Sequence, residues 1–350
     1  MKRQIDDNDQ PKRFKSTISH FENLPNETIY QIFEYLDAYD IYLAFYTYDQ
    51  RFQNLILNPS STTFQVHIPN ISRIDFERYR DDFVLFHRRH IQCLRISNPF
   101  LFEELLSPPR IITDFKQLHT LILQQNDIKF LHKIMDHHLR KLSNLQSLTI
   151  SLTDTTLDPS CLLFSAICLP HLKRFEFNYP TDFPFYFYGY GSSSIETLII
   201  NSSFRFHCLG ELLMNLTNLR YLSIETLVGL KHSSIDYADN HFNKQLKYVN
   251  IKIDGVPFHS LRFLVEHYFK PVEEFYLTVR HMSTIIEAMH WQELLRIHMP
   301  SIRYFDLNYM DTSMIDIHAF QSLSYHEIKS SFAYQENEKG NIIYSIEPYR

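Results

Sequence analysis

Glycine and cysteine are scarce in this chain, and their scarcity excludes several kinds of site. Only 6 of the 350 residues are glycine, and the one GxG, Gly189 to Gly191, has no strand-to-helix phosphate loop around it. The 4 cysteines lie far apart and form no CxxC pair, which favours reduced thiols over a disulfide framework or a zinc site. We therefore expect no nucleotide, no metal and no other cofactor.

An excess of basic charge and long apolar runs are also missing. Lysine and arginine number 34 against 40 aspartates and glutamates, a net charge of -6 without a basic stripe, so we expect no nucleic-acid partner. No apolar run has the length of a membrane span, and the first residues hold no apolar signal segment. These absences predict an intracellular protein without membrane contact. The basic cluster from Pro11 to Lys15 leaves cytoplasm and nucleus both open.

A repeated apolar pattern is the main feature that the chain does have. The motif LxxLxL, with any large apolar residue at the leucine positions, recurs at intervals of 23 to 30 residues. It begins at Ile91, Leu118, Leu145, Leu172, Ile195, Leu219, Leu246, Val272 and Ile302. A near-constant period of this size is typical of repeat architectures, in which a single unit cannot bury its own apolar face.

Each copy of the pattern predicts a short strand. The fourth and sixth positions face one side and the third, fifth and seventh the other, so one face is core and the other is open. Inward residues that we expect to be buried include Leu148, Phe175, Leu198, Leu222, Val249, Phe275 and Phe305. Helical apolar spacing follows in residues 128–139, 208–216, 258–269 and 285–295. Stacking of such units predicts an α/β fold in the form of a curved, right-handed solenoid.

The units resemble the longer leucine-rich repeats of the ribonuclease-inhibitor type. The asparagine or cysteine that this family carries at the ninth position occurs here only as Asn126, so the turn ladder departs from the family. The resemblance implies nine to ten repeats across residues 61–324, with a concave strand face that binds protein. An ordinary α/β sheet of apolar strands is the alternative, which the near-constant spacing disfavours.

Three segments lie outside this pattern. Residues 178–194 contain two prolines, two glycines and a dense aromatic run, which predicts a packed loop. Residues 325–350 contain two arms of alternating apolar residues around Lys339, Gly340 and Asn341, which predicts a hairpin that caps the C-terminal end. Residues 1–18 mix charges of both signs without an apolar core, which predicts a disordered tail.

Residues 19–60 predict a small helical module. Pro25 and Glu27 suit a first helical turn, and Asp40 can cap a following helix that carries Ile41 and Phe45. Between them one apolar stripe has helical spacing: Ile29, Ile32, Phe33 and Leu36. A unit this short rarely has a sufficient core, so we expect the stripe to need an external partner.

This module resembles an F-box, whose pattern is Leu-Pro, Ile-Phe-x-x-Leu, an Asp-Leu turn and a final Arg-Phe or Arg-Trp. The matching residues, in order, are Leu24, Pro25, Ile32, Phe33, Leu36, Asp40, Ile41, Arg51 and Phe52. Two departures are Tyr48, near the family's usual cysteine, and one extra residue before Phe52. The resemblance implies that the module binds the Skp adaptor, and through it a cullin scaffold and a RING subunit. The implied adaptor contacts are Leu24, Pro25, Ile29, Ile32, Phe33, Leu36, Ile41 and Phe45. A plain helical cap on the repeats is the alternative.

The function that follows from this resemblance is substrate recognition in a Skp-cullin-F-box ubiquitin ligase, with no chemistry performed by the chain itself. No catalytic set is evident, since the 19 histidines form neither HExxH nor a Cys/His quartet, and no nucleophile has an evident base. The alternative is a non-catalytic leucine-rich-repeat scaffold or inhibitor that binds a protein without ubiquitin transfer. Fold alone does not separate these two functions.

Tyrosines mark the predicted surface for the unknown protein substrate. In the last four copies of the pattern, four of the twelve open positions are tyrosine, whereas the fifteen open positions of the first five copies have none. The substrate contacts that we predict are Tyr221, Tyr248, Tyr276, Tyr304, Glu225 and Asp306. Tyr221 and Tyr248 should stand side by side, because neighbouring strands lie about 4.8 Å apart. The acids favour a basic or polar target, and the alternative is that the rings only stack on one another over the sheet.

Overall fold

The computed structural model divides the chain into two compact units, residues 1–58 and 59–350. It describes residues 21–57, 64–98, 101, 104–105, 114–126, 131–132, 134–135, 138–153, 158–180, 193–229, 244–281, 288–309, 330–336 and 342–348. The predicted tail at residues 1–18, most of the predicted loop at 178–194 and the tip of the predicted hairpin lie outside the described residues.

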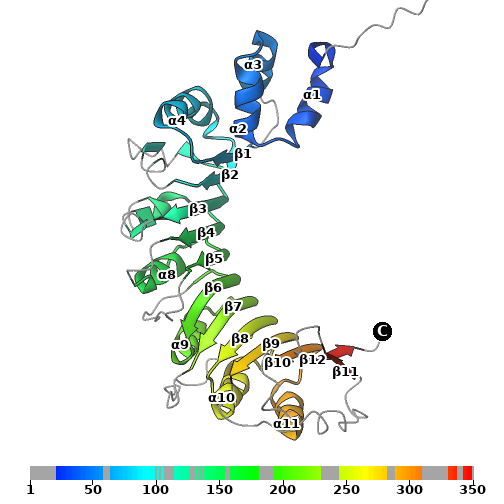
Figure 1. Cartoon of the computed structure of the whole chain (residues 1–350). Helices are drawn as coiled ribbons and strands as arrows, with labels where there is room; N and C mark the ends of the chain where they lie inside the picture. The colour runs from blue at the N-terminus through cyan, green and yellow to red at the C-terminus, as the bar shows by residue number, and fades with distance from the viewer. Residues whose placement is uncertain are drawn as a thin grey trace, which may run out of the picture. The chain divides into compact units, whose positions relative to one another are not determined.

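The N-terminal unit is helical (Figure 1). Its elements are the 3₁₀ turn η1 Phe21–Asn23, α1 Asn26–Phe33, α2 Ala38–Ile41, the π-helical turn η2 Tyr42–Tyr46 and α3 Gln50–Leu57. α1 begins directly after Pro25 and carries Glu27 in its first turn, where a carboxylate meets the positive end of the helix. The Asp37 side chain caps α2 by accepting a hydrogen bond from the Tyr39 amide at 2.8 Å. The prediction that Asp40 is the cap is wrong, because α2 begins at Ala38 and Asp40 lies inside it.

The second unit is built on one sheet. Its strands are β1 Phe64–Ile68, β2 Ile91–Ile96, β3 Thr120–Asn126, β4 Ser147–Leu152, β5 Arg174–Asn178, β6 Thr197–Arg205, β7 Tyr221–Val228, β8 Tyr248–Asp254, β9 Glu274–His281, β10 Tyr304–Tyr309, β11 Ser330–Glu336 and β12 Ile342–Pro348. From β1 to β10, each described strand pairs in parallel with the next one in the chain. β12 then pairs antiparallel with both β10 and β11, which places two antiparallel strands on either side of the segment around Gly340.

The helices of the second unit lie on one face of this sheet (Figure 1). They are α4 Arg73–Tyr79, the π-helical turn η3 Arg80–Val84, α5 Leu85–His87, η5 Leu139–Lys141, α8 Ser160–Ile167, η6 Phe206–Cys208, α9 Leu209–Asn215, α10 Phe258–Tyr268 and α11 Ala288–His298. α10 contacts both α9 and α11. Helices predicted at 208–216, 258–269 and 285–295 correspond to α9, α10 and α11, and only part of 128–139 is described.

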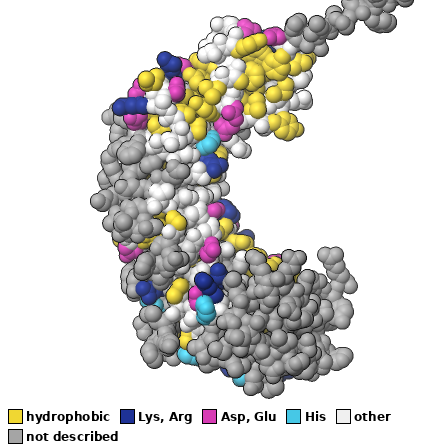
Figure 2. Space-filling view, viewed as in Figure 1, with side chains coloured by type: hydrophobic (Ala, Val, Ile, Leu, Met, Phe, Trp, Pro, Cys, Tyr) yellow, Lys and Arg dark blue, Asp and Glu magenta, His cyan; other side chains and the backbone are white. Residues whose placement is uncertain are grey.

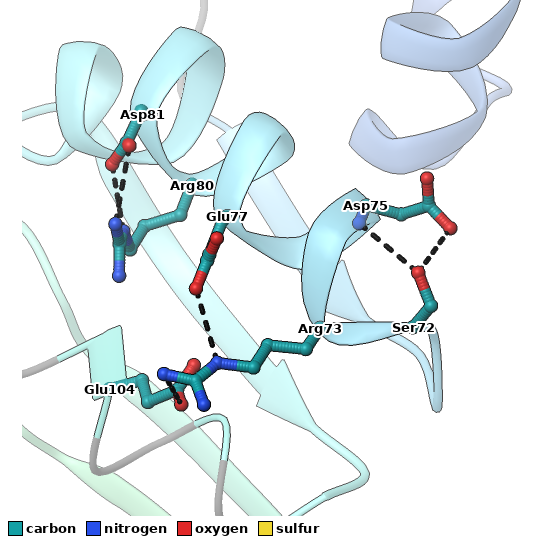
Figure 3. A network of polar contacts seen from close by, with 7 residues as sticks. All are labelled: Ser72, Arg73, Asp75, Glu77, Arg80, Asp81 and Glu104. Atoms are coloured by element: carbon teal, nitrogen blue, oxygen red, sulfur yellow. Dashed lines mark hydrogen bonds and ion pairs between the residues drawn. The ribbon is translucent and has the colours of Figure 1, made fainter.

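Polar contacts fix α4 at the start of this unit (Figure 3). The Ser72 hydroxyl accepts a hydrogen bond from the Asp75 amide at 3.2 Å, which caps the helix. Arg73 pairs with Glu77 one turn later at 3.1 Å and with Glu104 at 3.2 Å, so it links α4 to a distant segment of the chain. Arg73 is largely exposed, and such pairs contribute about 0 to 1 kcal/mol each, so this network orients α4 more than it stabilises it.

The core lies between the sheet and the helices. Burial alternates along the strands, as in the pattern of β6 and β9, so alternate side chains face the core and the others face the open side. The predicted inward residues are confirmed as fully buried: Leu148, Phe175, Leu198, Leu222, Val249, Phe275 and Phe305. The apolar alternation therefore predicts the face of each of these strands correctly.

The prediction of a right-handed leucine-rich-repeat solenoid is wrong. The structure describes an α/β fold built on an extended parallel sheet that ends in an antiparallel pair. The apolar pattern predicts buried strands, but any parallel sheet with consecutive neighbouring strands produces it, so the pattern does not identify a repeat family.

Candidate functional site

The apolar stripe of α1 packs inside the N-terminal unit. Ile29 is fully buried against Phe52 and Leu55 of α3, and Phe33 and Phe45 pack on the same cluster. The rings of Phe45 and Phe52 are 5.5 Å apart, and those of Phe33 and Phe45 are 5.3 Å apart. The stripe therefore has an internal partner in α3, at Ile29 and Phe33, which sequence reasoning did not predict.

The predicted adaptor residues differ in accessibility. Ile29 and Ile41 are buried, whereas Leu24, Ile32, Phe33 and Phe45 are partly buried, and Pro25 and Leu36 are exposed. Leu36 does not continue the stripe of α1, because the helix ends at Phe33 and Leu36 lies in the turn before α2. Of the set, Leu36 is the large apolar side chain most open to a partner, at 38% exposure.

Other apolar side chains are more exposed on this unit. Figure 2 shows hydrophobic side chains over much of its visible surface. Tyr35 is 90% exposed, Tyr48 61% and Leu43 56%. The predicted adaptor contacts did not include these residues because the prediction followed the helical stripe, whereas large apolar side chains exposed off the buried stripe are candidates for an interaction surface. We refer to Tyr35, Leu36, Leu43 and Tyr48 as the exposed apolar set.

Arg51 ties α3 to the start of the unit. Its guanidinium donates hydrogen bonds to the carbonyl oxygens of Glu22 and Leu24, the latter at 2.6 Å, and to the Asn26 side-chain oxygen at 2.5 Å. A planar guanidinium carries five N–H donors, so it can bind several acceptors at once. The Tyr48 hydroxyl donates to the Glu22 carboxylate, and that hydrogen bond raises the pKa of Tyr48. These bonds hold the turn before α1 against α3.

The tyrosines predicted on the open face of the sheet form a continuous row of neighbouring rings, which we call the tyrosine ladder: Tyr221, Tyr248, Tyr276 and Tyr304. The rings of Tyr221 and Tyr248 are 4.2 Å apart and nearly parallel, at 7°, so their predicted side-by-side position is confirmed. Tyr248 and Tyr276 are 5.1 Å apart, and Tyr276 and Tyr304 are 5.0 Å apart. Tyr221 and Tyr248 stack, and the other two pairs are tilted by 35° and 36°, so part of the ring surface is already covered.

Strand register explains the zigzag of the ladder. Tyr248 lies opposite Glu274, which in turn lies opposite Tyr304, so Glu274 stands between two tyrosine positions. Tyr276 is two residues further along β9 and lies opposite both Asn250 and Asp306. Diagonal neighbours on a sheet face remain within reach of aromatic side chains. Tyr276 can therefore contact both Tyr248 and Tyr304, although it lies two residues further along its strand.

Burial affects the titration of the ladder and of its neighbouring acid. It raises the pKa of Tyr248, with a further contribution from the hydroxyl of Tyr221, and it also raises the pKa of Tyr276. The Tyr276 hydroxyl donates a hydrogen bond to Glu274 at 3.4 Å. Burial raises the pKa of Asp306, whose Oδ1 atom has no hydrogen-bond partner among the described residues. Asp306 is therefore a partly desolvated carboxylate beside the ladder.

Glu225 belongs to a separate polar hollow. The hollow has a volume of about 640 Å³ toward the carboxyl ends of β6 to β9, and its lining includes Glu225, Lys252, Asp254 and Arg280. The register of β7 shifts between Ile224 and Leu227, so Glu225 does not follow the ladder as predicted. Asp254 lies 2.8 Å from His281 and 3.8 Å from Arg280. Two cationic and two anionic side chains balance in this lining, so it selects neither sign of charge.

Sites for chemistry are not evident in the described part of the chain. Within it, no group of three or more histidine, cysteine or acidic side chains could hold a metal ion. Burial, followed by the nearby His90, lowers the pKa of His87 to about 4, and the His87 ring packs against Phe83 at 4.6 Å, which suits a neutral core residue. Among the described helices, none has both the length and the apolar character that a bilayer crossing requires.

The two candidate surfaces are therefore the exposed apolar set on the helical unit and the tyrosine ladder on the sheet. The first exposes apolar side chains and the second exposes tyrosines, residue types that are enriched at protein interfaces. Comparison of the chain with protein-family models and with curated proteins finds no match in either.

Proposed function

We propose that this chain is the substrate-recognition subunit of a Skp-cullin-F-box ubiquitin ligase. In this role the helical unit binds the Skp adaptor, and the open face of the sheet binds a protein target. The observation that carries the proposal is the presence of two contact surfaces on two compact units, one apolar and helical, the other aromatic and on a sheet. The ordered match of Leu24 to Phe52 with the F-box pattern supports the adaptor as the partner of the first unit.

The exposed apolar set is the part of the helical unit best suited to bind the adaptor. Apolar side chains that lie open on a small helical unit lose water when a partner covers them, at about 25 cal/mol per Å² of buried apolar area. Ile29, Phe52 and Leu55 form a core beneath the surface, and Arg51 fastens the first turn to α3. A preformed unit of this kind loses little entropy when it docks.

Co-purification with the Skp adaptor tests this role. Leu36→Asp with Leu43→Asp changes two exposed positions, so we expect the fold to persist and adaptor binding to weaken at least about tenfold. Ile74→Asp with Phe86→Asp is the matched control, because both residues are exposed apolar side chains of the second unit. Equal recovery of adaptor with the wild type and the first variant would remove the proposed role.

The ligase role assigns no catalytic residue to the chain. Ubiquitin transfer would occur on the RING subunit and its conjugating enzyme, which the cullin scaffold brings to the target. The chain would contribute the choice of target and its position. With this role goes an intracellular location in the cytoplasm, the nucleus or both.

A second candidate is a protein-binding scaffold or inhibitor that does not take part in ubiquitin transfer. The closed aromatic core of the helical unit favours it, because a unit that packs on itself can serve as a plain cap of the chain. The same co-purification separates the two functions. A scaffold would hold its target without binding the adaptor.

A further inference from the structure

The stacked rings of the tyrosine ladder limit what can bind there. The rings of Tyr221, Tyr248, Tyr276 and Tyr304 lie 4.2 to 5.1 Å apart, so neighbouring rings cover part of one another's surface. An aromatic side chain or a nucleobase cannot enter between them without separating the stack. The ring edges and the hydroxyl groups remain, and a phenol oxygen accepts hydrogen bonds as readily as it donates them.

Two carboxylates stand among these rings. Glu274 is exposed and lies in register between Tyr248 and Tyr304, and Asp306 lies in register with Tyr276. Among the described residues, no lysine or arginine forms an ion pair with either one. Asp306 is also partly desolvated, and its Oδ1 atom has no hydrogen-bond partner there. A carboxylate in this condition gains most from a cation that donates hydrogen bonds.

The two basic side chains just before β8 and β10 form ion pairs with another acid, and Lys252 of β8 lies opposite Thr278 and lines the polar hollow. Lys247 and Arg303 both pair with Glu273, Arg303 at 3.3 Å. Glu273 precedes β9, whereas Glu274 of β9 and Asp306 of β10 lie on the open face of the sheet. The ladder therefore combines tyrosine hydroxyl groups with two negative charges, which favour cations over phosphate groups.

We infer that the tyrosine ladder binds an extended, basic segment of a partner protein, whose arginine or lysine side chains contact Glu274, Asp306 and the tyrosine hydroxyls. This inference rests on the proposed function, in which the target occupies the open face. Four strands about 4.8 Å apart span roughly 14 Å, which an extended peptide crosses in about four to five residues. Guanidinium and ammonium groups supply charged donors for the two carboxylates.

Fluorescence anisotropy with labelled heptapeptides tests the inference on the full chain. The probes alternate glycine with arginine, serine or glutamate, and an oligothymidylate is the nucleic-acid arm. We expect the arginine peptide to bind at least about tenfold more tightly than each of the other probes. Asp306→Asn with Glu274→Gln should weaken that binding about tenfold, because it removes both carboxylates and keeps their shape.

The matched control is Glu77→Gln with Glu176→Gln, which changes the net charge equally. Glu77 lies on α4, and Glu176 lies on the open face of β5, in register with Thr149 and Ile199 and away from the ladder. We expect this control to bind the arginine peptide as the wild type does. If Asp306→Asn lowers the melting temperature too far for measurement, the exposed Glu274→Gln alone carries the test, with an expected loss of about threefold.

The inference is overturned if the two double variants bind the arginine peptide equally, if no probe binds, or if another peptide or the oligothymidylate binds more tightly. Adaptor co-purification on the same protein keeps the two proposals distinct. Peptide binding without adaptor binding removes the ligase role and leaves this inference standing. Adaptor binding with the peptide result negative removes only this inference.

Discussion

The open face of the sheet differs between its first and second halves. From β1 to β6, polar side chains hydrogen-bond across neighbouring strands. Ser97 donates to Gln124 at 3.2 Å, Asn178 donates to Ser151 at 3.0 Å, and Asn201 donates to Asn178 at 2.6 Å. From β7 to β10, neighbouring tyrosine rings take the place of these polar rows, together with Glu274 and Asp306, which have no cationic partner among the described residues.

The two halves of the sheet share the same buried positions and differ in the side chains of the open face. Both halves bury the same alternate positions, so the strands and the core need no difference between the open faces. Polar rows that satisfy one another leave few groups for a partner, whereas the ladder leaves acceptor groups unsatisfied. A partly buried carboxylate without a cationic partner lowers stability, and carboxylates with shifted pKa values occur often at functional sites.

The largest expected effect is on the shared core, where the two halves should not differ. Leu222 is fully buried in β7, between Leu198 and Val249 in register, so Leu222→Ala should lower the free energy of unfolding by about 2 to 5 kcal/mol. Ser223→Ala, at the next position on the open side, should cost less than about 0.5 kcal/mol. Urea unfolding of both variants measures this, and an equal cost would contradict the assigned faces.

The second prediction separates the open faces. The triple variant Tyr221→Ala, Tyr248→Ala and Tyr304→Ala should weaken binding of the arginine peptide at least about tenfold, because aromatic anchors dominate such contacts. Its control changes Ile122, Thr149 and Ile199 to alanine. These residues lie on the open face of β3, β4 and β6, in one row across the first half of the sheet. Anisotropy titration of both triple variants, with circular dichroism to check the fold, gives the answer. Equal affinities would show that the ladder only covers the sheet.

The third prediction concerns the polar rows of the first half. Asn178→Ala removes the hydrogen bonds to Ser151 and Asn201, so it should lower the free energy of unfolding by about 0.5 to 1.5 kcal/mol. Peptide affinity should stay unchanged, because these side chains serve the sheet itself. Loss of peptide affinity in this variant, at an intact melting temperature, would extend the binding surface into the first half.

The smallest effect is the pH dependence from Asp306. Burial raises the pKa of this carboxyl in the folded chain, so the folded state keeps the proton more tightly than the unfolded state does. As the pH rises above the usual range of an aspartate, the unfolded state releases the proton first, and the free energy of unfolding falls. Asp306→Asn lacks this loss, and its thermal midpoint should change less between about pH 4 and pH 7 than that of the wild type. An identical pH profile would show that Asp306 is fully solvated.

Sequence reasoning predicts local features of this chain better than long-range ones. The alternation of apolar residues predicts buried positions such as Leu222 and Phe275, because alternation is a property of each strand alone. The repeat family is not predictable in this way, since the spacing contains no information on how the connections pack. The internal partner of Ile29 was missed because Phe52 lies more than twenty residues away and beyond a π-helical turn.

For the candidate site, too, the sequence predicts strand register but not local irregularities or helix ends. The stacking of Tyr221 and Tyr248 follows from the spacing of the pattern, which sets the strand register. Glu225 was predicted beside the ladder, but an irregularity in β7 directs it to the polar hollow, and alternation gives no sign of such a bulge. The exposed positions of Tyr35 and Leu43 depend on where the short helices end, which cap residues such as Asp37 determine.

Hydrogen-deuterium exchange of the full chain, alone and with purified Skp adaptor or arginine peptide, tests the central claim of two separate contact surfaces most directly. We predict that the adaptor slows exchange within residues 24–56 and leaves β7 to β10 unchanged, because the two surfaces lie on different compact units. The peptide should slow exchange in β7 to β10 alone. Unchanged exchange of residues 24–56 with the adaptor present in excess would contradict the account.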